Sequence, residues 1–189
     1  MKKKGKEKFG RGTVLLAEPF MVDPNFKRAV VLLCDNDKEA GTVGFVLNKP
    51  MQIEVDSLVA DFPEFGATVY YGGPVANDTI HYLHNRGDLI PDCIEVAPGI
   101  FWGGDFDQIK FLISSQLILS SDIRFYVGYS GWSPGQLDDE LRYGSWVLTA
   151  MDPNYLFKTK SEDLWSKVME HKGENYTVIA QMPDNPNLN

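Results

Sequence analysis

Near its N-terminus the sequence carries short apolar runs that are rich in β-branched residues and bounded by polar residues, glycine or proline. Runs of about 4–8 such residues between turn residues are typical of β-strands. Three of them lie at Thr13–Ala17, Arg28–Cys34 and Thr42–Leu47. The polar stretch 35–41 between the last two ends in glycine, so we predict that these two runs form a hairpin. The chain is therefore expected to fold around a β-sheet.

Further strand-like runs occur along the rest of the chain. Each is apolar or aromatic and is bounded by turn residues. Strands are predicted at Val69–Tyr71, at Ile94–Trp102 with an interruption at Pro98-Gly99, at Arg124–Tyr129 and at Ser145–Ala150.

Helical spacing of apolar residues indicates two helices in the first two thirds of the chain. One is predicted over Ile53–Phe62, where Pro63 stops it. The other begins at Asp105, an N-cap type of residue with Gln108 three positions on, and is expected to end near Ser120. Its inner face is expected to carry Ile109, Leu112, Ile113 and Leu117.

Two more helices are predicted in the last third. The segment Ser133-Pro134-Gly135-Gln136 has the pattern of a capping box with proline at the first helical position, followed by Leu137 and Leu141 on a buried edge. A final helix is predicted over Ser161–His171. Its inward residues are expected to be Leu164, Trp165, Val168 and Met169.

Length and composition indicate one folded domain. A chain of 189 residues, 43% of them apolar, can bury a core without disulfides or a structural metal, and is short for two ordinary domains. We expect a single domain over residues 12–189. Residues 1–11 hold six basic side chains and one aromatic residue, and we expect this tail to be disordered.

The distribution of charge argues against nucleic acid as a partner of the folded domain. The chain has 18 basic and 26 acidic residues, of which the tail holds six and one, for a tail charge of +5. The remainder then has 12 basic and 25 acidic residues, a net charge of −13. A surface this negative repels phosphate backbones.

The sequence carries no signal that points to a membrane or to export. The apolar run at Thr13–Ala17 is broken by Glu18-Pro19 and is too short for the apolar core of a signal peptide. The longest run elsewhere, Ala29–Cys34, is far shorter than the roughly 18 residues that a membrane span needs. We therefore expect a cytoplasmic protein whose two cysteines, Cys34 and Cys93, are reduced.

Several segments together resemble one known family. They include Asp23-Pro24 with Phe26, Leu47-Asn48-Lys49-Pro50, Gly72-Gly73-Pro74-Val75, Leu83-His84, Gly103-Gly104-Asp105, Gly128 to Leu137, Glu140-Leu141 and Trp146. On these motifs the chain resembles the AlgH/YqgE family of bacterial proteins over nearly the whole of residues 12–189.

That resemblance carries expectations about fold and function. It implies an α/β (α+β) fold, a compact sandwich with a mixed, largely antiparallel β-sheet flanked by helices. Family members are often labelled as transcriptional regulators, and no catalytic mechanism comes with the family. The charge of the folded domain disfavours direct DNA binding, and no helix-turn-helix with a basic recognition helix is visible.

Two histidines have a spacing that could serve a metal. His81 and His84 are three residues apart, as ligands on one helix face would be. The same stretch fits a strand, in which the two imidazoles point to opposite faces. With only three histidines in the chain, we favour the strand and predict no metal site. A metal-dependent hydrolase at His81 and His84 is the alternative.

Gly128-Tyr129-Ser130-Gly131-Trp132 nearly matches the Gly-x-Ser-x-Gly turn that presents a nucleophilic serine in hydrolases. Trp132 stands where the second glycine belongs, and no histidine is placed to act as a base. We favour a tight turn in which Ser133 caps the following helix. A hydrolase using Ser130 is the alternative.

The remaining candidates are polar and glycine residues that we expect in turns at strand ends, where binding sites of α/β proteins gather. The glycine turns lack nucleotide-binding motifs, so we predict no cofactor. Trp132 is either a rigid contact anchor or a core residue. We expect a non-enzymatic binding or regulatory module that acts through a protein or small-molecule partner. Its candidate binding residues are Asn48, Lys49, Gly72, Gly73, Asn77, Trp132 and Gln136.

Overall fold

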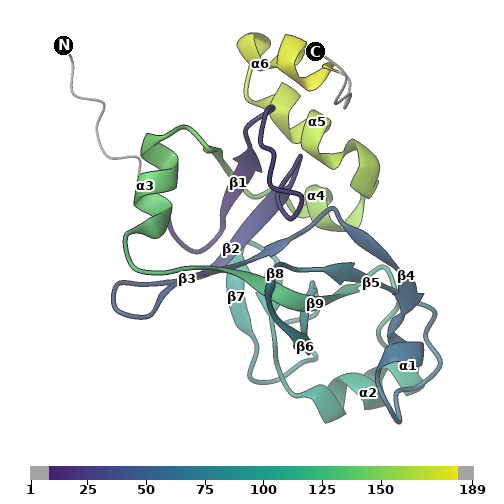
Figure 1. Ribbon diagram of the computed structural model, residues 1–189. Coiled ribbons are helices and arrows are strands. Elements are labelled where there is room, and N and C mark those ends of the chain that lie inside the picture. The colour runs from purple at the N-terminus through teal and green to yellow at the C-terminus, as the bar shows by residue number, and fades with distance from the viewer. Residues whose placement is uncertain (1–8, 183–189) are drawn as a thin grey trace.

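The computed structural model describes residues 9–182, and within that range ten strands and six helices form an α+β fold (Figure 1). The predicted fold class is thereby confirmed. The strands form one curled sheet, largely antiparallel, in which only β5 and β9 run parallel. The strands are β1 (Thr13–Ala17), β2 (Val30–Asp37), β3 (Gly41–Val46), β4 (Pro50–Glu54), β5 (Thr68–Tyr71), β6 (Val75–His84), β7 (Ile94–Ala97), β8 (Ile100–Trp102), β9 (Ile123–Trp132) and β10 (Trp146–Ala150).

Strand β9 holds the sheet together. The strand order is β10-β1-β2-β3-β9-β6-β8-β7, with β5 also paired to β9 and β4 to β5. The last residues of β9 pair with β3, and its first residues lie between β5 and β6. The predicted hairpin is confirmed as β2 and β3, joined by a turn at residues 38–40.

The helices lie at opposite ends of the sheet (Figure 1). The short helix α1 and helix α2 lie at one end. Helices α4, α5 and α6 lie at the other end, and α3 lies beside β1. Their bounds are α1 (Val55–Leu58), α2 (Phe106–Ser114), α3 (Gln136–Arg142), α4 (Pro153–Phe157), α5 (Ser161–His171) and α6 (Glu174–Ala180). Among the described residues, no helix has both the length and the apolar character needed to cross a membrane.

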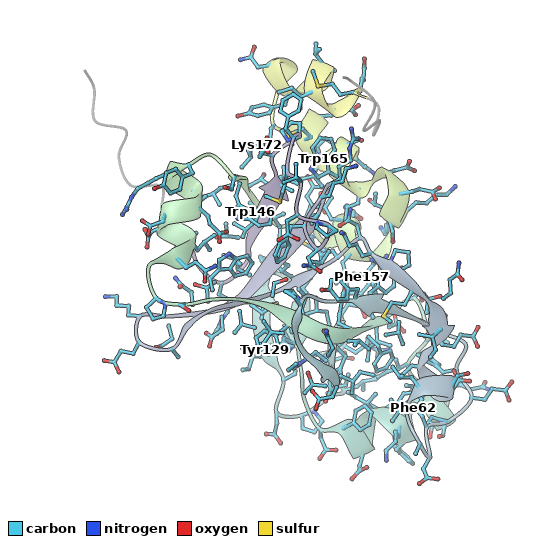
Figure 2. The ribbon with its side chains drawn as sticks, viewed as in Figure 1. Phe62, Tyr129, Trp146, Phe157, Trp165 and Lys172 are labelled. Carbon is cyan, nitrogen blue, oxygen red and sulfur yellow. The ribbon has the colours of Figure 1, made fainter. Side chains whose placement is uncertain are left out.

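Three clusters of buried side chains form the core. The first packs α4 and α5 on one face of the sheet through Leu156, Trp165 and their neighbours. The second packs α2 on the other face, around Phe125. The third lies under α3 and contains Trp132 and Trp146. Figure 2 shows Trp165, Trp146 and Phe62 at these three places.

Helix α5 has the predicted bounds and the predicted inner face, because Leu164, Trp165, Val168 and Met169 are all at most 2% exposed. The start of α2 is also confirmed. Its N-cap Asp105 accepts a hydrogen bond from the Gln108 backbone N–H at 2.8 Å. The predicted end near Ser120 is wrong. Helix α2 stops at Ser114, because Gln116 adopts a left-handed conformation at φ 57°.

The predicted inward position of Leu117 is wrong for the same reason. Leu117 follows the turn at Gln116 and is 51% exposed. The helix predicted over Ile53–Phe62 is wrong at both ends. Residues 50–54 form β4 and pair with β5, and the helical part is the single turn Val55–Leu58.

The turn predicted at Gly128-Tyr129-Ser130-Gly131-Trp132 is the largest error. These residues continue β9, whose last three pair with Thr42, Val43 and Gly44 of β3. Glycine allows the backbone at residue 128 to lie close to the backbone at Gly73, since a Cβ on Gly128 would lie 2.7 Å from the Gly73 carbonyl oxygen. The helix expected from Pro134 begins at Gln136 instead, with Gly135 as its N-cap at φ 83°.

Candidate functional site

Two of the predicted binding residues line a hollow between the β2–β3 hairpin and α5. This hollow, called the basic hollow below, has a volume of about 220 Å³. Its lining residues are Lys27, Arg28, Asn48, Lys49, Ser161, Glu162, Trp165 and Ser166.

Asn48 fixes the wall of the basic hollow. Its side-chain oxygen accepts from the Val30 N–H at 2.9 Å, and its amide donates to the Arg28 carbonyl at 2.9 Å. One amide therefore ties the end of β3 to the residues that lead into β2. This arrangement explains why Lys27 and Arg28 stand beside Lys49.

Lys49 extends along the same wall. Its ammonium donates to the Pro24 carbonyl at 2.6 Å. Burial lowers the pKa of Lys49, and the nearby charge of Asp23 opposes that shift. A partly desolvated ammonium interacts more strongly with an incoming negative group than a fully hydrated one does.

Arg28 contributes a second cation in a fixed orientation. Its guanidinium lies 4.7 Å from the centroid of the Trp165 ring and donates to the Met182 carbonyl. Such stacking holds the guanidinium plane against the indole. Glu162 is the one acidic side chain among the residues that line the basic hollow, which has three basic ones.

Lys27, Arg28 and Trp165 were absent from the sequence-based candidates. A signal for the first two was available. Lys27 and Arg28 lie at the start of the first strand of a predicted hairpin, and Asn48 and Lys49 follow the second, so all four must lie at the same end of that hairpin. Trp165 could not be placed there from sequence, because it comes from a helix more than 100 residues later.

Gly72 and Gly73 lie against β9. The Gly72 N–H donates to the Val127 carbonyl at 2.8 Å, and its own carbonyl accepts from the Val46 N–H at 2.9 Å. A Cβ on either glycine would lie 2.3 Å from backbone atoms of β9. Asn77 is an exposed residue of β6, and its side-chain oxygen lies near Gly128. None of the three lines the basic hollow.

Trp132 and Gln136 share a different partner, Glu140 of α3. One carboxylate oxygen accepts from the Trp132 indole at 2.9 Å and from the Trp146 indole at 2.7 Å. The other oxygen accepts from the Gln136 amide at 3.0 Å. Trp132 is 4% exposed, so its ring is buried in the core. The capping box is half formed, since Gln136 accepts from the Ser133 N–H at 3.0 Å.

The structure therefore divides the predicted binding residues among three places. Asn48 and Lys49 line the basic hollow, the glycines contact β9, and Trp132 and Gln136 surround Glu140. A binding role for residues of the last two groups stays a prediction.

The histidine pair has the strand geometry that we favoured. His81 and His84 both lie in β6, three residues apart. His81 contacts the rings of Phe45 and Tyr129, whereas His84 stacks on Phe101 and bonds the Gly103 carbonyl at 2.9 Å. Within residues 9–182 no group of three or more His, Cys, Asp or Glu side chains could hold a metal ion.

Ser130 has neither the exposure nor the partners of a nucleophile. It is fully buried in β9, and its hydroxyl donates to the Gly72 carbonyl at 3.0 Å. A nucleophilic serine sits on an exposed strand-to-helix turn beside a base. The buried position of Ser130 therefore contradicts the alternative of a hydrolase that uses Ser130 as its nucleophile.

Comparison with known proteins identifies close relatives in sequence. A protein of Chlorobium phaeobacteroides assigned to family UPF0301 is 43% identical over 183 residues, which cover 97% of each chain. A UPF0301 protein of Bacteroides thetaiotaomicron is 37% identical over 95% of this chain and 91% of its own.

Solved structures have the same fold. A crystal structure of a Corynebacterium diphtheriae protein matches with a TM-score of 0.75 and 23% identity over 94% of both chains. The solution structure of the AlgH protein from Pseudomonas aeruginosa matches with a TM-score of 0.73 and 26% identity over 97% of this chain and 99% of that one. The profile of the AlgH-like family matches residues 14–177. The resemblance seen in the sequence is thus confirmed, and the chain belongs to the AlgH-like family.

Proposed function

We propose that this protein is a non-enzymatic cytoplasmic binding or regulatory module, and that its partner is a protein or small molecule that presents a negatively charged group to the basic hollow. The observation that carries the proposal is the convergence of Lys27, Arg28 and Lys49 on one hollow. They do so in a domain whose net charge over residues 12–189 is −13.

The local charge of the basic hollow differs in sign from the charge of the domain around it. Such a contrast favours a compact anionic group over an extended polyanion, because a duplex would also face the acidic surface outside the hollow. The Asn48 amide and the Arg28–Trp165 stack hold the cations in place before a partner arrives. Preorganisation of this kind reduces the entropy lost on binding.

The direct test uses as its probe a short fluorescent peptide whose only charged side chains are two adjacent glutamates, with full-length protein at low ionic strength. Replacing Lys49→Gln removes one cation of the basic hollow and should weaken binding on the order of tenfold, because charge-assisted contacts are the stronger ones. Lys110→Gln is the matched control. It removes one lysine charge on α2, where Lys110 pairs with Asp107 at 2.8 Å.

Thermal melting of each variant checks that it is folded. Equal affinity in wild type, Lys49→Gln and Lys110→Gln would remove the basic hollow from consideration as the binding surface. Tighter binding of duplex DNA than of the acidic peptide would instead support a transcriptional regulator that binds DNA directly. A pull-down with wild-type and Lys49→Gln baits then identifies the partner, as the protein or ligand lost with Lys49.

A further inference from the structure

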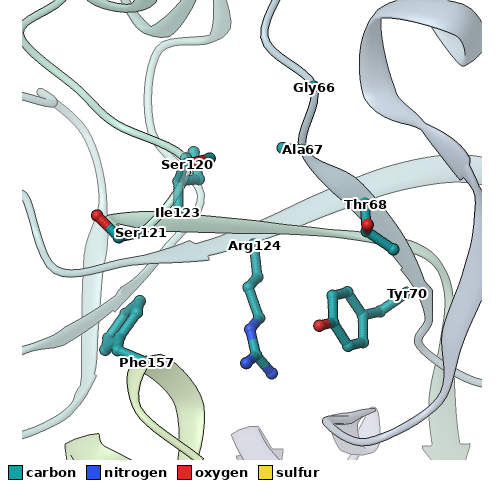
Figure 3. Close-up of a pocket in the computed structure, with 9 residues that line it drawn as sticks. All are labelled: Gly66, Ala67, Thr68, Tyr70, Ser120, Ser121, Ile123, Arg124 and Phe157. Carbon is teal, nitrogen blue, oxygen red and sulfur yellow. The ribbon is translucent and has the colours of Figure 1, made fainter. Parts of the chain in front are cut away.

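A second hollow lies on the same face of the sheet, between β5, the start of β9 and α4 (Figure 3). It has a volume of about 260 Å³. Its only charged lining residue is Arg124, and the rings of Tyr70 and Phe157 stand on either side of that side chain in Figure 3. The other lining residues are Gly66, Ala67, Thr68, Ser120, Ser121 and Ile123.

Arg124 is partly buried and uses few of its donors. One terminal nitrogen donates to the Leu47 carbonyl at 3.2 Å, and the guanidinium lies 4.6 Å from the Tyr70 ring centroid. A guanidinium has five N–H donors. In the described part of the chain, no carboxylate pairs with the guanidinium of Arg124.

A second polar group lies next to Arg124 on the same face of β9. Tyr126 is fully buried, and its polar neighbour is the Arg124 side chain. Burial raises the pKa of Tyr126, and the nearby Arg124 charge opposes that shift.

We propose that this second hollow binds the carboxylate of a small organic acid, held by the guanidinium of Arg124. Arginine and carboxylate match geometrically through two parallel N–H to oxygen bonds. The hydroxyl groups of Thr68, Ser120 and Ser121 surround the same space, and the rings of Tyr70 and Phe157 give the apolar part of the acid a place to pack.

Charge and size select the class of ligand. One guanidinium balances one negative charge, whereas a phosphate dianion would leave a second charge uncompensated in an acidic domain. The hollow is smaller than the roughly 300–1,000 Å³ of sites for drug-sized ligands, so an acid of the size of benzoate or smaller fits it. This site is distinct from the basic hollow and does not depend on the function proposed for it.

The test titrates ¹⁵N-labelled full-length protein with acetate, benzoate and phosphate, each at matched ionic strength and pH. The readout is the Nε–Hε resonance of Arg124. We expect benzoate to shift it in a saturable way, with a dissociation constant on the order of 1 mM. Acetate should bind more weakly, because it lacks the ring that packs on Tyr70 and Phe157.

Variants locate the effect. Arg124→Gln should weaken benzoate binding by at least about tenfold, and Arg124→Lys should weaken it too, since lysine cannot form the two parallel bonds. Arg142→Gln is the matched control, an exposed arginine of α3 that pairs with Asp139. Its benzoate affinity should equal that of the wild type.

Three outcomes overturn the proposal. They are no movement of the wild-type Arg124 resonance, a preference for phosphate over benzoate, and an equal loss in the Arg142→Gln control. Because the wild-type titration decides on its own, an Arg124→Gln variant that fails to fold does not weaken the test. None of these results bears on Lys49 or the acidic peptide, so the two proposals fail separately.

Discussion

Trp132 and Trp146 donate their indole N–H groups to the same carboxylate oxygen, that of Glu140, at 2.9 and 2.7 Å. Their rings meet edge to face with centroids 6.0 Å apart, and Phe26 packs against both. One acidic residue of α3 thereby joins the end of β9 to β10, although these strands lie on different sides of β1, β2 and β3 in the sheet order.

Replacing Glu140→Gln should lower the free energy of unfolding by about 1–3 kcal/mol, because a charged acceptor shared by two indoles becomes a neutral amide. Chemical denaturation measures the change. Asp139→Asn on the neighbouring exposed position is the control and should change stability little. Equal effects of the two substitutions would show that the helix charge matters and the shared acceptor does not.

Truncating Trp132→Ala should lower stability by about 3–5 kcal/mol, since the ring is 4% exposed and fills the core under α3. Tyr143→Ala, at a residue that is 87% exposed, should change it by less than about 0.5 kcal/mol. A folded Trp132→Ala protein of normal stability that has lost its partner would instead favour the contact-anchor interpretation of this tryptophan.

Acid should destabilise the protein through His81 and His84. Burial lowers the pKa of both imidazoles below the ordinary 6.5. Hydrogen bonding to the Gly103 carbonyl and the charge of Asp88 partly oppose the shift at His84. Below about pH 6.5 the unfolded chain therefore binds more protons than the folded one, and the free energy of unfolding decreases as the pH is lowered.

Their contribution is complete above about pH 6.5 and is lost as the pH falls from that value through the lowered pKa of the folded state. Urea unfolding at about pH 7.5 and about pH 5.5 measures the difference, and the drop should become smaller in His81→Gln. An unchanged drop in both His81→Gln and His84→Gln would assign the acid sensitivity to carboxylates.

The basic tail gives a fourth prediction. Five lysines of the tail lie in residues 1–8, outside the described residues, and their expected disorder stays a prediction. Arg11 belongs with the domain, because it donates to the Cys34 carbonyl at 3.1 Å and pairs with Asp35 at 3.2 Å. Removing residues 1–8 should therefore leave the melting temperature unchanged, while Arg11→Gln lowers it slightly.

The same tail should account for any affinity for DNA. Replacing its five lysines with glutamine in the full chain should abolish binding that is weak, salt-dependent and indifferent to sequence. Sequence-selective binding that survives this replacement would contradict the prediction. Gel shifts at two salt concentrations, with two unrelated duplexes, make the measurement.

Local patterns predicted well where burial and periodicity coincide. The bounds of α5 follow from its one apolar face, and the pairing of β2 with β3 follows from the polar turn between them, although β2 extends three residues beyond its predicted end at Cys34. The end of β9 could not be predicted in this way. Gly128 and Gly131 have the composition of a turn, and the pairing of residues 130–132 with β3, more than 80 residues earlier, continues the strand past them.

The same distinction applies to the candidate site. Asn48 and Lys49 were predictable because they end a strand, but Arg124 was hidden in a strand of apolar and aromatic residues. Its importance depends on what it does not contact, namely a carboxylate from any described residue. Whether Arg124 has a carboxylate partner depends on tertiary contacts and could not be predicted from the sequence.

The position of β9 in the sheet has a consequence for synthesis. Its three partners, β3, β5 and β6, all precede it in the chain, and β9 fills the space between β3 and β6. A nascent chain on the ribosome therefore carries β3, β5 and β6 with unpaired edges until residue 132 has left the exit tunnel. Unpaired edges of this kind are where chains aggregate, so this family member is expected to need protection by a chaperone until its last quarter is made.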